Sequence, residues 1–291
     1  MNPWAEPPIT AVRAAVALAL AEDLTPLGDL TASLLDPAAT TEARFGARGP
    51  GRLAGTACAT EAFVQIDPSI EVEWQFADGD ALEPGDTIGI VHGRLAPILT
   101  AERTALNFLG HLSGIATLTH AYVEAAASGG PAKVWDTRKT TPGLRSLEKA
   151  AVRAGGGRNH RGNLSDWMLL KDNHITGIGI AEAVRRCLDL WPARTVHVEC
   201  DRLEQMVEAI EAGATAVLLD NMTPDEVSAC VAEARRLAAA GHPALLEVSG
   251  GITLDTIASY SATGVDQIST GRITNSAPVL DIGLDIGPPV T

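Results

Sequence analysis

Residues 195–220, TVHVECDRLEQMVEAIEAGATAVLLD, contain the pattern on which the fold prediction rests. Two apolar runs, 195–198 and 216–219, flank a segment whose apolar residues recur at helical spacing. This pattern predicts a strand, a helix and a second, parallel strand. Further apolar runs of the same kind, separated by helical segments, occur at residues 133–137, 167–170, 244–248 and 265–268. Six such strands predict an α/β fold, either a barrel or a doubly wound sheet.

Each of the six runs ends in charged, hydroxyl or glycine-rich residues. In chain order these are Arg138-Lys139, Lys171, Glu199, Asp220, Ser249-Gly250-Gly251 and Ser269-Thr270-Gly271. In an α/β barrel the carboxyl ends of the strands form the active-site rim, and loops after the last strands commonly bind phosphate. A doubly wound sheet would gather its site at one switch point, usually beside a GxGxxG turn, which follows none of these strands. The pattern therefore favours the barrel.

Side-chain alternation predicts where two of the terminal carboxylates point. In the run 195–199, Val196 and Val198 share one face, while His197 and Glu199 share the other. With the valines against the helices, Glu199 points into the mouth of the barrel, and the same count turns Asp220 inward. Asp220 alone would also suit the N-cap of a helix. A pair of carboxylates facing a cationic segment favours a functional site.

Positive charge is concentrated in one segment of an acidic chain. The net formal charge of −14 argues against a nucleic-acid partner. Residues 133–171 nevertheless hold nine Lys and Arg against three acidic residues, and they include all four lysines of the chain. Arg145, Lys149 and Arg153, four residues apart, suit a solvated helix face. The cations that close strands do not, and they indicate an anion-binding site.

Residues 1–115 show a different pattern, typical of an α+β domain. We expect a helix at about 10–22 and a long helix from 100 to about 127. Between them lie strand-like runs at residues 43–48, 51–57, 70–76 and 86–92. The turn-rich texture is that of a biotinyl or lipoyl carrier, but no lysine precedes Lys133 to bear such a group.

Cysteine spacing and hydropathy bear on the compartment. The four cysteines are far apart, without metal-ligand spacing, and predict buried thiols in a reducing compartment. No apolar run approaches the ~18 residues of a membrane-spanning helix. The first residues lack the basic segment of a secretory signal. We expect a cytoplasmic protein that has no membrane partner.

Several motifs together resemble the quinolinate phosphoribosyltransferase family. In chain order they are residues 28–31, 102–107, 134–145, 155–161, 170–174, 198–199, 218–221, 249–252 and 263–266. The resemblance covers nearly the whole chain. It implies an N-terminal α/β sandwich domain, residues 1–115, and an incomplete, seven-stranded α/β barrel, residues 116–275, with the tail 276–291 returning to the sandwich.

The resemblance also implies an activity. Members of the family transfer the phosphoribosyl group of phosphoribosyl pyrophosphate (PRPP) to the ring nitrogen of quinolinate, releasing pyrophosphate and CO2. The product is nicotinate mononucleotide, in de novo NAD synthesis. The implied cofactor is Mg²⁺, bound mainly through PRPP near Glu199 and Asp220. The implied assembly is a homodimer or a higher oligomer, in which Arg103 reaches the neighbouring subunit's site.

The resemblance assigns roles to the site residues. Lys139, Glu199 and Asp220 are the implied catalytic residues: Lys139 contacts the pyrophosphate, and the carboxylates bind the ribose hydroxyls. The implied quinolinate-binding residues are Arg103, Arg138, His160, Arg161 and Lys171, with Thr137 beside them. The implied cradle of the 5′-phosphate consists of Ser249, Gly250, Gly251, Ser269, Thr270 and Gly271. Glycine suits such a cradle because it lets backbone N–H groups approach an anion.

Two positions depart from the family pattern, and two other functions stay open. Asn275 stands where the family often has histidine, and His197 where it often has a carboxylate. His197 is interpreted either as a partner of Glu199 or as a hydrogen-bonded core histidine. One alternative function is phosphoribosyl transfer to another heterocyclic carboxylate. The other is a Schiff-base barrel aldolase using Lys139 or Lys171, which leaves the two Ser/Gly loops unexplained.

Overall fold

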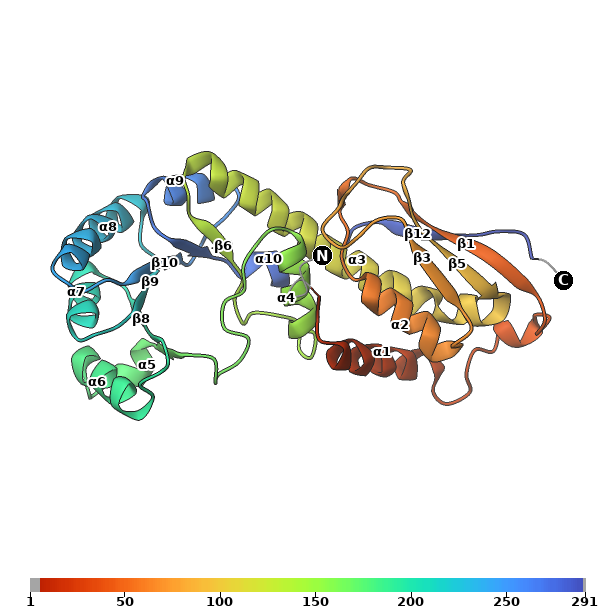
Figure 1. Ribbon diagram of the computed structural model, residues 1–291, viewed down its shortest axis with the longest axis horizontal. Coiled ribbons are helices and arrows are strands. Elements are labelled where there is room, and N and C mark those ends of the chain that lie inside the picture. The colour runs from red at the N-terminus through yellow and green to blue at the C-terminus, as the bar shows by residue number, and fades with distance from the viewer. Residues whose placement is uncertain (1–5, 290–291) are drawn as a thin grey trace. The chain divides into compact units, whose positions relative to one another are not determined.

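The computed structural model describes residues 6–289, and the chain divides into two compact units (Figure 1). The first unit comprises residues up to 120, 140–156 and from 274 onward; the second comprises 121–139 and 157–273. These limits differ from the predicted domain boundaries chiefly at 140–156, which group with the first unit. Over the described range, no helix is both long and apolar enough to cross a membrane.

The first unit is built on a four-stranded antiparallel sheet. Its strands, in spatial order, are β12 (Ile282–Ile286), β1 (Thr40–Ala47), β5 (Thr87–Arg94) and β3 (Glu71–Trp74). Side chains alternate along β1, so that Ala43 and Phe45 are buried while Arg44 is exposed. The Phe45 ring stacks on Trp74 at 5.2 Å and meets Phe63 edge-on at 6.0 Å. This apolar face is the core of the unit.

Helices α1 (Ile9–Leu24) and α2 (Thr56–Ile66) pack against each other in this unit. The sequence prediction of a strand-like run at 51–57 is wrong, because only Gly51–Arg52 form a strand, β2, which pairs with β4 (Ala81–Leu82). Gly55, with φ of 98°, provides the left-handed turn before α2. Helix α2 escaped prediction because alanines make up much of its buried face, and alanine contributes little to a hydrophobic period.

The remaining elements of this unit are a short 3-10 helix, the first part of a long helix and one further helix. They are η1 (Ala32–Leu34), α3 (Leu95–Gly129) and α4 (Arg145–Ala154). Helix α3 starts earlier than predicted and continues into the second unit.

The second unit contains a six-stranded parallel sheet. Its strands are β6 (Lys133–Trp135), β7 (Met168–Leu170), β8 (Val196–Cys200), β9 (Ala216–Asp220), β10 (Leu245–Ser249) and β11 (Gln267–Ser269). Their spatial order is β6-β11-β10-β9-β8-β7, with each neighbouring pair parallel. One parallel bridge, between Trp135 and Arg158, continues the pairing beyond β6. Within residues 6–289, β6 and β7 do not pair with each other, so the prediction of an incomplete α/β barrel is confirmed; the sheet has six strands where seven were predicted, and the pairing beyond β6 is a single bridge.

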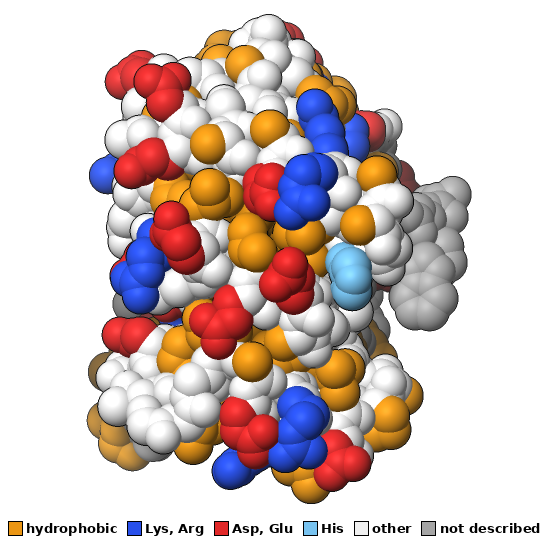
Figure 2. Space-filling model, turned by 90° about the vertical axis from the view of Figure 1, so that its left-hand side faces the viewer, with side chains coloured by type: hydrophobic (Ala, Val, Ile, Leu, Met, Phe, Trp, Pro, Cys, Tyr) orange, Lys and Arg blue, Asp and Glu red, His pale blue; other side chains and the backbone are white. Residues whose placement is uncertain are grey.

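Helices follow the strands of this unit and cover the outer face of the sheet (Figure 1). They are α5 (Asp172–Ile175), α6 (Ile180–Leu190), α7 (Leu203–Glu211), α8 (Pro224–Ala239) and α9 (Ile257–Ala262). The short helix α10 (Arg272–Asn275) follows β11 at the limit of the unit. Helix α7 packs on β8 and β9. Val196 and Val198, on β8, are fully buried. On the side of the molecule seen in Figure 2, acidic and basic side chains are interspersed rather than gathered by sign.

Candidate active site

A pocket of about 350 Å³ opens at the carboxyl ends of the parallel strands. All its lining residues belong to the second unit. They are Thr137, Arg138, Lys139, His160, Arg161, Leu169, Lys171, Glu199, Leu218, Asp220, Glu247, Ser249 and Ser269. The pocket therefore brings together the strand-terminal cations and carboxylates that are far apart in the sequence.

The strand register explains why the carboxylates meet. Glu199 on β8 pairs with Leu218 on β9, and Leu218 pairs with Glu247 on β10. Because paired positions of neighbouring strands present their side chains on the same face, these three residues form one row across the sheet. All three line the pocket. Asp220 lies two residues beyond Leu218, so its side chain belongs to the same face.

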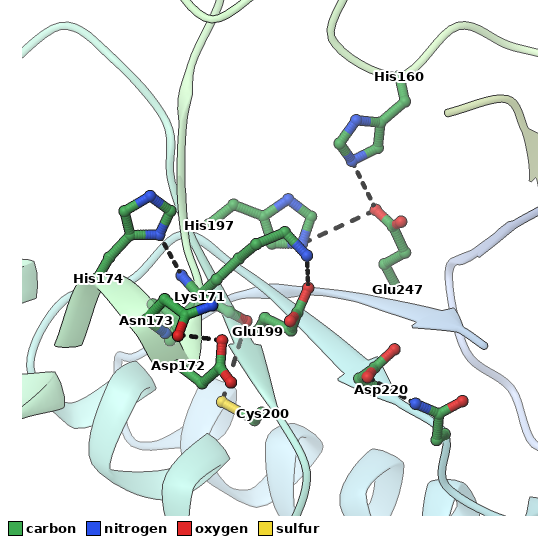
Figure 3. A network of polar contacts seen from close by, with 12 residues as sticks. His160, Lys171, Asp172, Asn173, His174, His197, Glu199, Cys200, Asp220 and Glu247 are labelled. Atoms are coloured by element: carbon green, nitrogen blue, oxygen red, sulfur yellow. Dashed lines mark hydrogen bonds and ion pairs between the residues drawn. The ribbon is translucent and has the colours of Figure 1, made fainter. Parts of the chain in front are cut away.

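Asp220 is not a helix cap. The N-cap of α8 is Thr223, whose hydroxyl accepts a hydrogen bond from the backbone N–H of Glu226 in a capping box. The Asp220 carboxylate instead accepts a hydrogen bond of 2.7 Å from the side-chain amide of Asn221. This leaves the carboxylate facing the pocket (Figure 3).

Lys171 and Glu199 form an ion pair within the pocket (Figure 3). The Lys171 side chain, just after β7, is 43% exposed, and that of Glu199 is 17% exposed. An ion pair in this setting orients both groups more than it stabilises the fold. The ammonium of Lys171 is thus committed to a carboxylate, which does not favour the neutral amine that a Schiff base needs.

Two arginines, Arg138 and Arg161, line the pocket and interact electrostatically. Arg161 is buried, and burial together with the positive charge of Arg138 lowers its pKa, against a smaller opposite effect of Asp166. Its Nη1 donates a hydrogen bond of 3.3 Å to the carbonyl of Trp167. Like charges held close together at low solvent exposure favour the binding of an anion between them.

A buried histidine–carboxylate cluster adjoins the pocket, and two of its members, His160 and Glu247, line it (Figure 3). Nε2 of His160 is 3.2 Å from Oε2 of Glu247, and Nε2 of His197 is 3.8 Å from the same oxygen. Burial lowers the pKa of His197 to about 4, outweighing the raising effect of Glu247. His197 is therefore a buried, neutral histidine whose ring faces Glu247, and it does not line the pocket.

The two Ser/Gly loops flank the pocket. Ser249 and Ser269 line it, whereas Gly250, Gly251, Thr270 and Gly271 follow them in the chain and are not lining residues. Gly250 has φ of 94°, and a Cβ there would lie 2.2 Å from the Asn221 side chain. A Cβ on Gly271 would lie 2.9 Å from the Lys139 side chain. Glycine is thus required at position 250 by its positive φ and by the Asn221 contact, whereas at position 271 a side chain would have to displace Lys139.

Two predicted or noted residues lie outside this pocket. Arg103 is on α3 in the first unit, where it lines a separate cavity of about 500 Å³ with residues including Asn107 and Leu280. Asn275 ends α10, where its side-chain oxygen accepts a hydrogen bond from the Ser276 hydroxyl. The predicted role of Arg103 in a neighbouring subunit stays a prediction.

Three lining residues, Leu169, Leu218 and Glu247, were not among the predicted site residues. The alternation that turned Glu199 inward would have found Glu247, since it shares a face of β10 with the strand-terminal Ser249. Leu169 sits in an unbroken apolar run, which has no alternation to exploit.

Comparison with known proteins yields one consistent match. Residues 29–113 match the family model described as quinolinate phosphoribosyl transferase, N-terminal domain, and residues 115–285 match that of the C-terminal domain. The chain is 41% identical over 263 residues to the probable nicotinate-nucleotide pyrophosphorylase [carboxylating] of Bacillus subtilis, covering 89% of this chain and 88% of the relative. It is 39% identical to the nicotinate-nucleotide pyrophosphorylase [carboxylating] of Mycobacterium leprae, covering 95% and 97% of the two chains.

Solved structures are similar over the same length. The nicotinate-nucleotide pyrophosphorylase from Francisella tularensis superposes with a TM-score of 0.90 at 38% identity, over 97% of this chain and 98% of the other. NadC from Streptococcus pyogenes superposes with a TM-score of 0.89 at 37% identity, over 97% and 99%.

Proposed function

The chain belongs to the quinolinate phosphoribosyltransferase family, and we propose that it transfers the phosphoribosyl group of PRPP to quinolinate with decarboxylation. The products are nicotinate mononucleotide, pyrophosphate and CO2, so the enzyme is a pentosyltransferase of de novo NAD synthesis.

One observation carries the proposal: the second unit gathers Arg138, Lys139, Arg161 and Lys171 into one pocket with Glu199 and Asp220. Quinolinate is a dicarboxylate and PRPP carries three phosphate groups, so both substrates need a site rich in cations. Arginine binds planar carboxylates in bidentate fashion, while lysine acts as a point charge. The carboxylates suit the ribosyl carbon, which becomes positive as pyrophosphate leaves.

The transfer forms one bond and breaks another. The ring nitrogen of quinolinate bonds to C1 of the ribosyl group while the C1–O bond to pyrophosphate breaks, its electron pair leaving with pyrophosphate. The ring nitrogen is then positive, so it stabilises the electron pair that remains on C2 when the adjacent carboxylate departs as CO2. A proton on C2 completes the product. The protein orients the reactants and stabilises charge through fixed groups, which is the usual source of such acceleration.

Within this proposal each part of the pocket has a task. Arg138, Arg161 and His160 hold the carboxylates of quinolinate, together with Lys171. Lys139 contacts the pyrophosphate, and the loops at Ser249 and Ser269 hold the 5′-phosphate. Glu199 and Asp220 stabilise the positive ribosyl carbon through charge that matters most in the transition state.

Mg²⁺ is part of the proposal. Carboxylate oxygens are the donors that Mg²⁺ prefers, and Glu199 and Asp220 both present them to the pocket. These two residues would hold the ion together with oxygens of PRPP. When bound, it neutralises the negative charge of the departing pyrophosphate.

We also propose a homodimer in which Arg103 completes the partner's site, and a cytoplasmic location. The family resemblance assigns Arg103 to the site of a neighbouring subunit, and the position of Arg103 outside the pocket of the second unit supports this proposal. The location is supported by four free cysteines, of which Cys58, Cys200 and Cys230 are buried.

A direct assay tests the function. Supplied with PRPP, Mg²⁺ and quinolinate labelled in the 2-carboxyl group, the protein should release labelled CO2 and form nicotinate mononucleotide in equal amounts. Release of pyrophosphate with a different heterocyclic carboxylate, and none with quinolinate, would contradict the assignment. Borohydride trapping with carbonyl substrates separates the aldolase alternative, since only a Schiff base is reduced to a stable adduct.

A further inference from the structure

Glu247 is a buried carboxylate that the proposed chemistry does not use. It lies in the middle of β10, with a side chain only 2% exposed, yet it lines the pocket. Burial raises the pKa of Glu247, but the combined opposite effect of the His160, His197 and Ser269 side chains is larger. The pKa of Glu247 therefore lies below its usual range. The pocket thus has an anion among its lining residues.

An anion at this position opposes the task of the pocket. Quinolinate brings two negative charges, and a buried carboxylate without compensation would repel them. A buried anion beside a substrate of the same charge is tolerated where neighbouring groups compensate it. The partners of Glu247 indicate what its role is.

His160 is the partner through which Glu247 reaches the pocket. Its Nε2 is 3.2 Å from Oε2 of Glu247, against 3.8 Å for Nε2 of His197. His160 lines the pocket and His197 does not. Since burial keeps His197 neutral, with a pKa of about 4, it offers Glu247 no full positive charge at neutral pH.

Two further contacts of His160 hold its main chain and the position of its ring. The backbone N–H of His160 donates a 2.8 Å hydrogen bond to Oδ1 of Asp136, which anchors the main chain. The ring packs against Trp167 with a centroid separation of 4.9 Å and an interplanar angle of 57°. This aromatic contact limits where the ring lies, whereas the carboxylate selects which nitrogen carries a proton toward it.

We infer that Glu247 is a positioning residue of the substrate site: it holds the His160 imidazole by Nε2 and so fixes a group that binds a carboxylate of quinolinate. The inference rests on the proposed function, because it concerns how that substrate is held. The Glu247 carboxylate faces Nε2 of His160 at 3.2 Å, and both side chains line the pocket. The substrate therefore meets an oriented donor rather than an exposed anion.

The test is Glu247→Gln, which keeps the size of the side chain and removes its charge. We expect the KM for quinolinate to rise about tenfold or more, as for the loss of a hydrogen bond to a charged group. The KM for PRPP and kcat should change little. Glu247→Asp, which keeps the charge at shorter reach, should give an intermediate KM for quinolinate.

A double variant and a matched control sharpen the result. In a His160→Asn background, Glu247→Gln should add little further loss, because the two residues act as one unit. The control is Asp67→Asn in the first unit, which neutralises another buried carboxylate, one that pairs with Arg94 at 2.7 Å. It should lower the melting temperature and leave the KM for quinolinate unchanged.

The contrary outcomes are distinct. A lower KM for quinolinate in Glu247→Gln would show that the carboxylate only repels substrate, and a lower melting temperature at unchanged KM would show a purely structural role. Stoichiometric zinc in the purified protein would assign the cluster to a metal instead, since its two imidazoles and carboxylate lie within 4.8 Å of one another. If Glu247→Gln does not fold, an unchanged KM in Glu247→Asp overturns the inference. If the wild type fails to convert quinolinate, the proposed function fails first.

Discussion

The two sheets of this protein use the same alternation of side chains but treat their second faces differently. In both, one face is apolar and buried: Phe45 on β1 is fully buried, as is Val198 on β8. The other face of the antiparallel sheet carries Glu42 and Arg44, which form an exposed ion pair of 2.7 Å. The other face of the parallel sheet carries Glu247, which is buried.

The difference shows where free energy is spent on function. An exposed ion pair keeps its hydration and contributes little either way. A buried charge loses its hydration, and nearby groups must compensate for that loss. The loss and the compensation seldom cancel, so a buried charge usually changes the free energy of unfolding. The inner face of the parallel sheet concentrates such groups around one pocket, and the antiparallel sheet does not. Removing charges from the two faces should therefore have very different consequences.

The largest expected effect comes from leaving one buried cation of the pocket without its anion. Nicotinate lacks one carboxylate of quinolinate, so it leaves Arg161 or its neighbours unpaired. Because Arg161 is buried, the cost should be on the order of 3–5 kcal/mol, or roughly 10²- to 10⁴-fold in kcat/KM. Lys171 contributes less, since it is partly exposed and already pairs with Glu199. Parallel assays with the two acids and PRPP check this; similar kcat/KM values would place the carboxylates elsewhere.

The next effect concerns the row of carboxylates on β8 and β9. Glu199→Gln and Asp220→Asn keep shape while removing charge from the ribosyl site. We expect each to lower kcat on the order of 10²-fold, since the charge acts mainly in the transition state. Quinolinate binding, measured by calorimetry without PRPP, should survive. A variant that loses quinolinate affinity but keeps kcat would remove these residues from the ribosyl site.

The two sheets also differ in how well their sequences predict the structure. Strands of the parallel sheet end abruptly in charged or glycine residues, so both the barrel and the residues at its rim could be predicted, Glu199 and Asp220 among them. Glu247 was missed because it lies inside an apolar run rather than at its end; its alternation with Ser249 is the sequence signal, and the register with Leu218 gives its place in the row. Helix α2 was missed because alanine gives a weak hydrophobic period. Contacts across strands depend on pairing, which no single run of sequence specifies.

The third prediction tests whether the first unit supplies any residue to the chemistry. In the proposed dimer, Arg103 and Lys139 act in one site but come from different subunits. Arg103→Ala and Lys139→Ala should each be nearly inactive. In a sample unfolded, mixed 1:1 and refolded, half of the dimers are mixed, and each has one intact site because a two-fold interface exchanges equivalent residues. Activity should recover to about a quarter of wild type. If mixing restores nothing, Arg103 either serves its own subunit's site or is structural.

The smallest effect is expected on the exposed face of the antiparallel sheet, and it completes the contrast with Glu247. Glu42→Gln removes a carboxylate that is 42% exposed and contacts Arg44 and, at 3.9 Å, His92. Since solvent screens such pairs, the free energy of unfolding should change by less than about 1 kcal/mol, and the KM for quinolinate should not change. Denaturant unfolding and steady-state kinetics, run beside Glu247→Gln, measure both quantities. A loss of more than about 2 kcal/mol in the free energy of unfolding exceeds what an exposed ion pair contributes. Such a loss would mean that this face of the sheet is covered in the assembled protein. The second faces of the two sheets would then differ less in burial than their exposure here indicates.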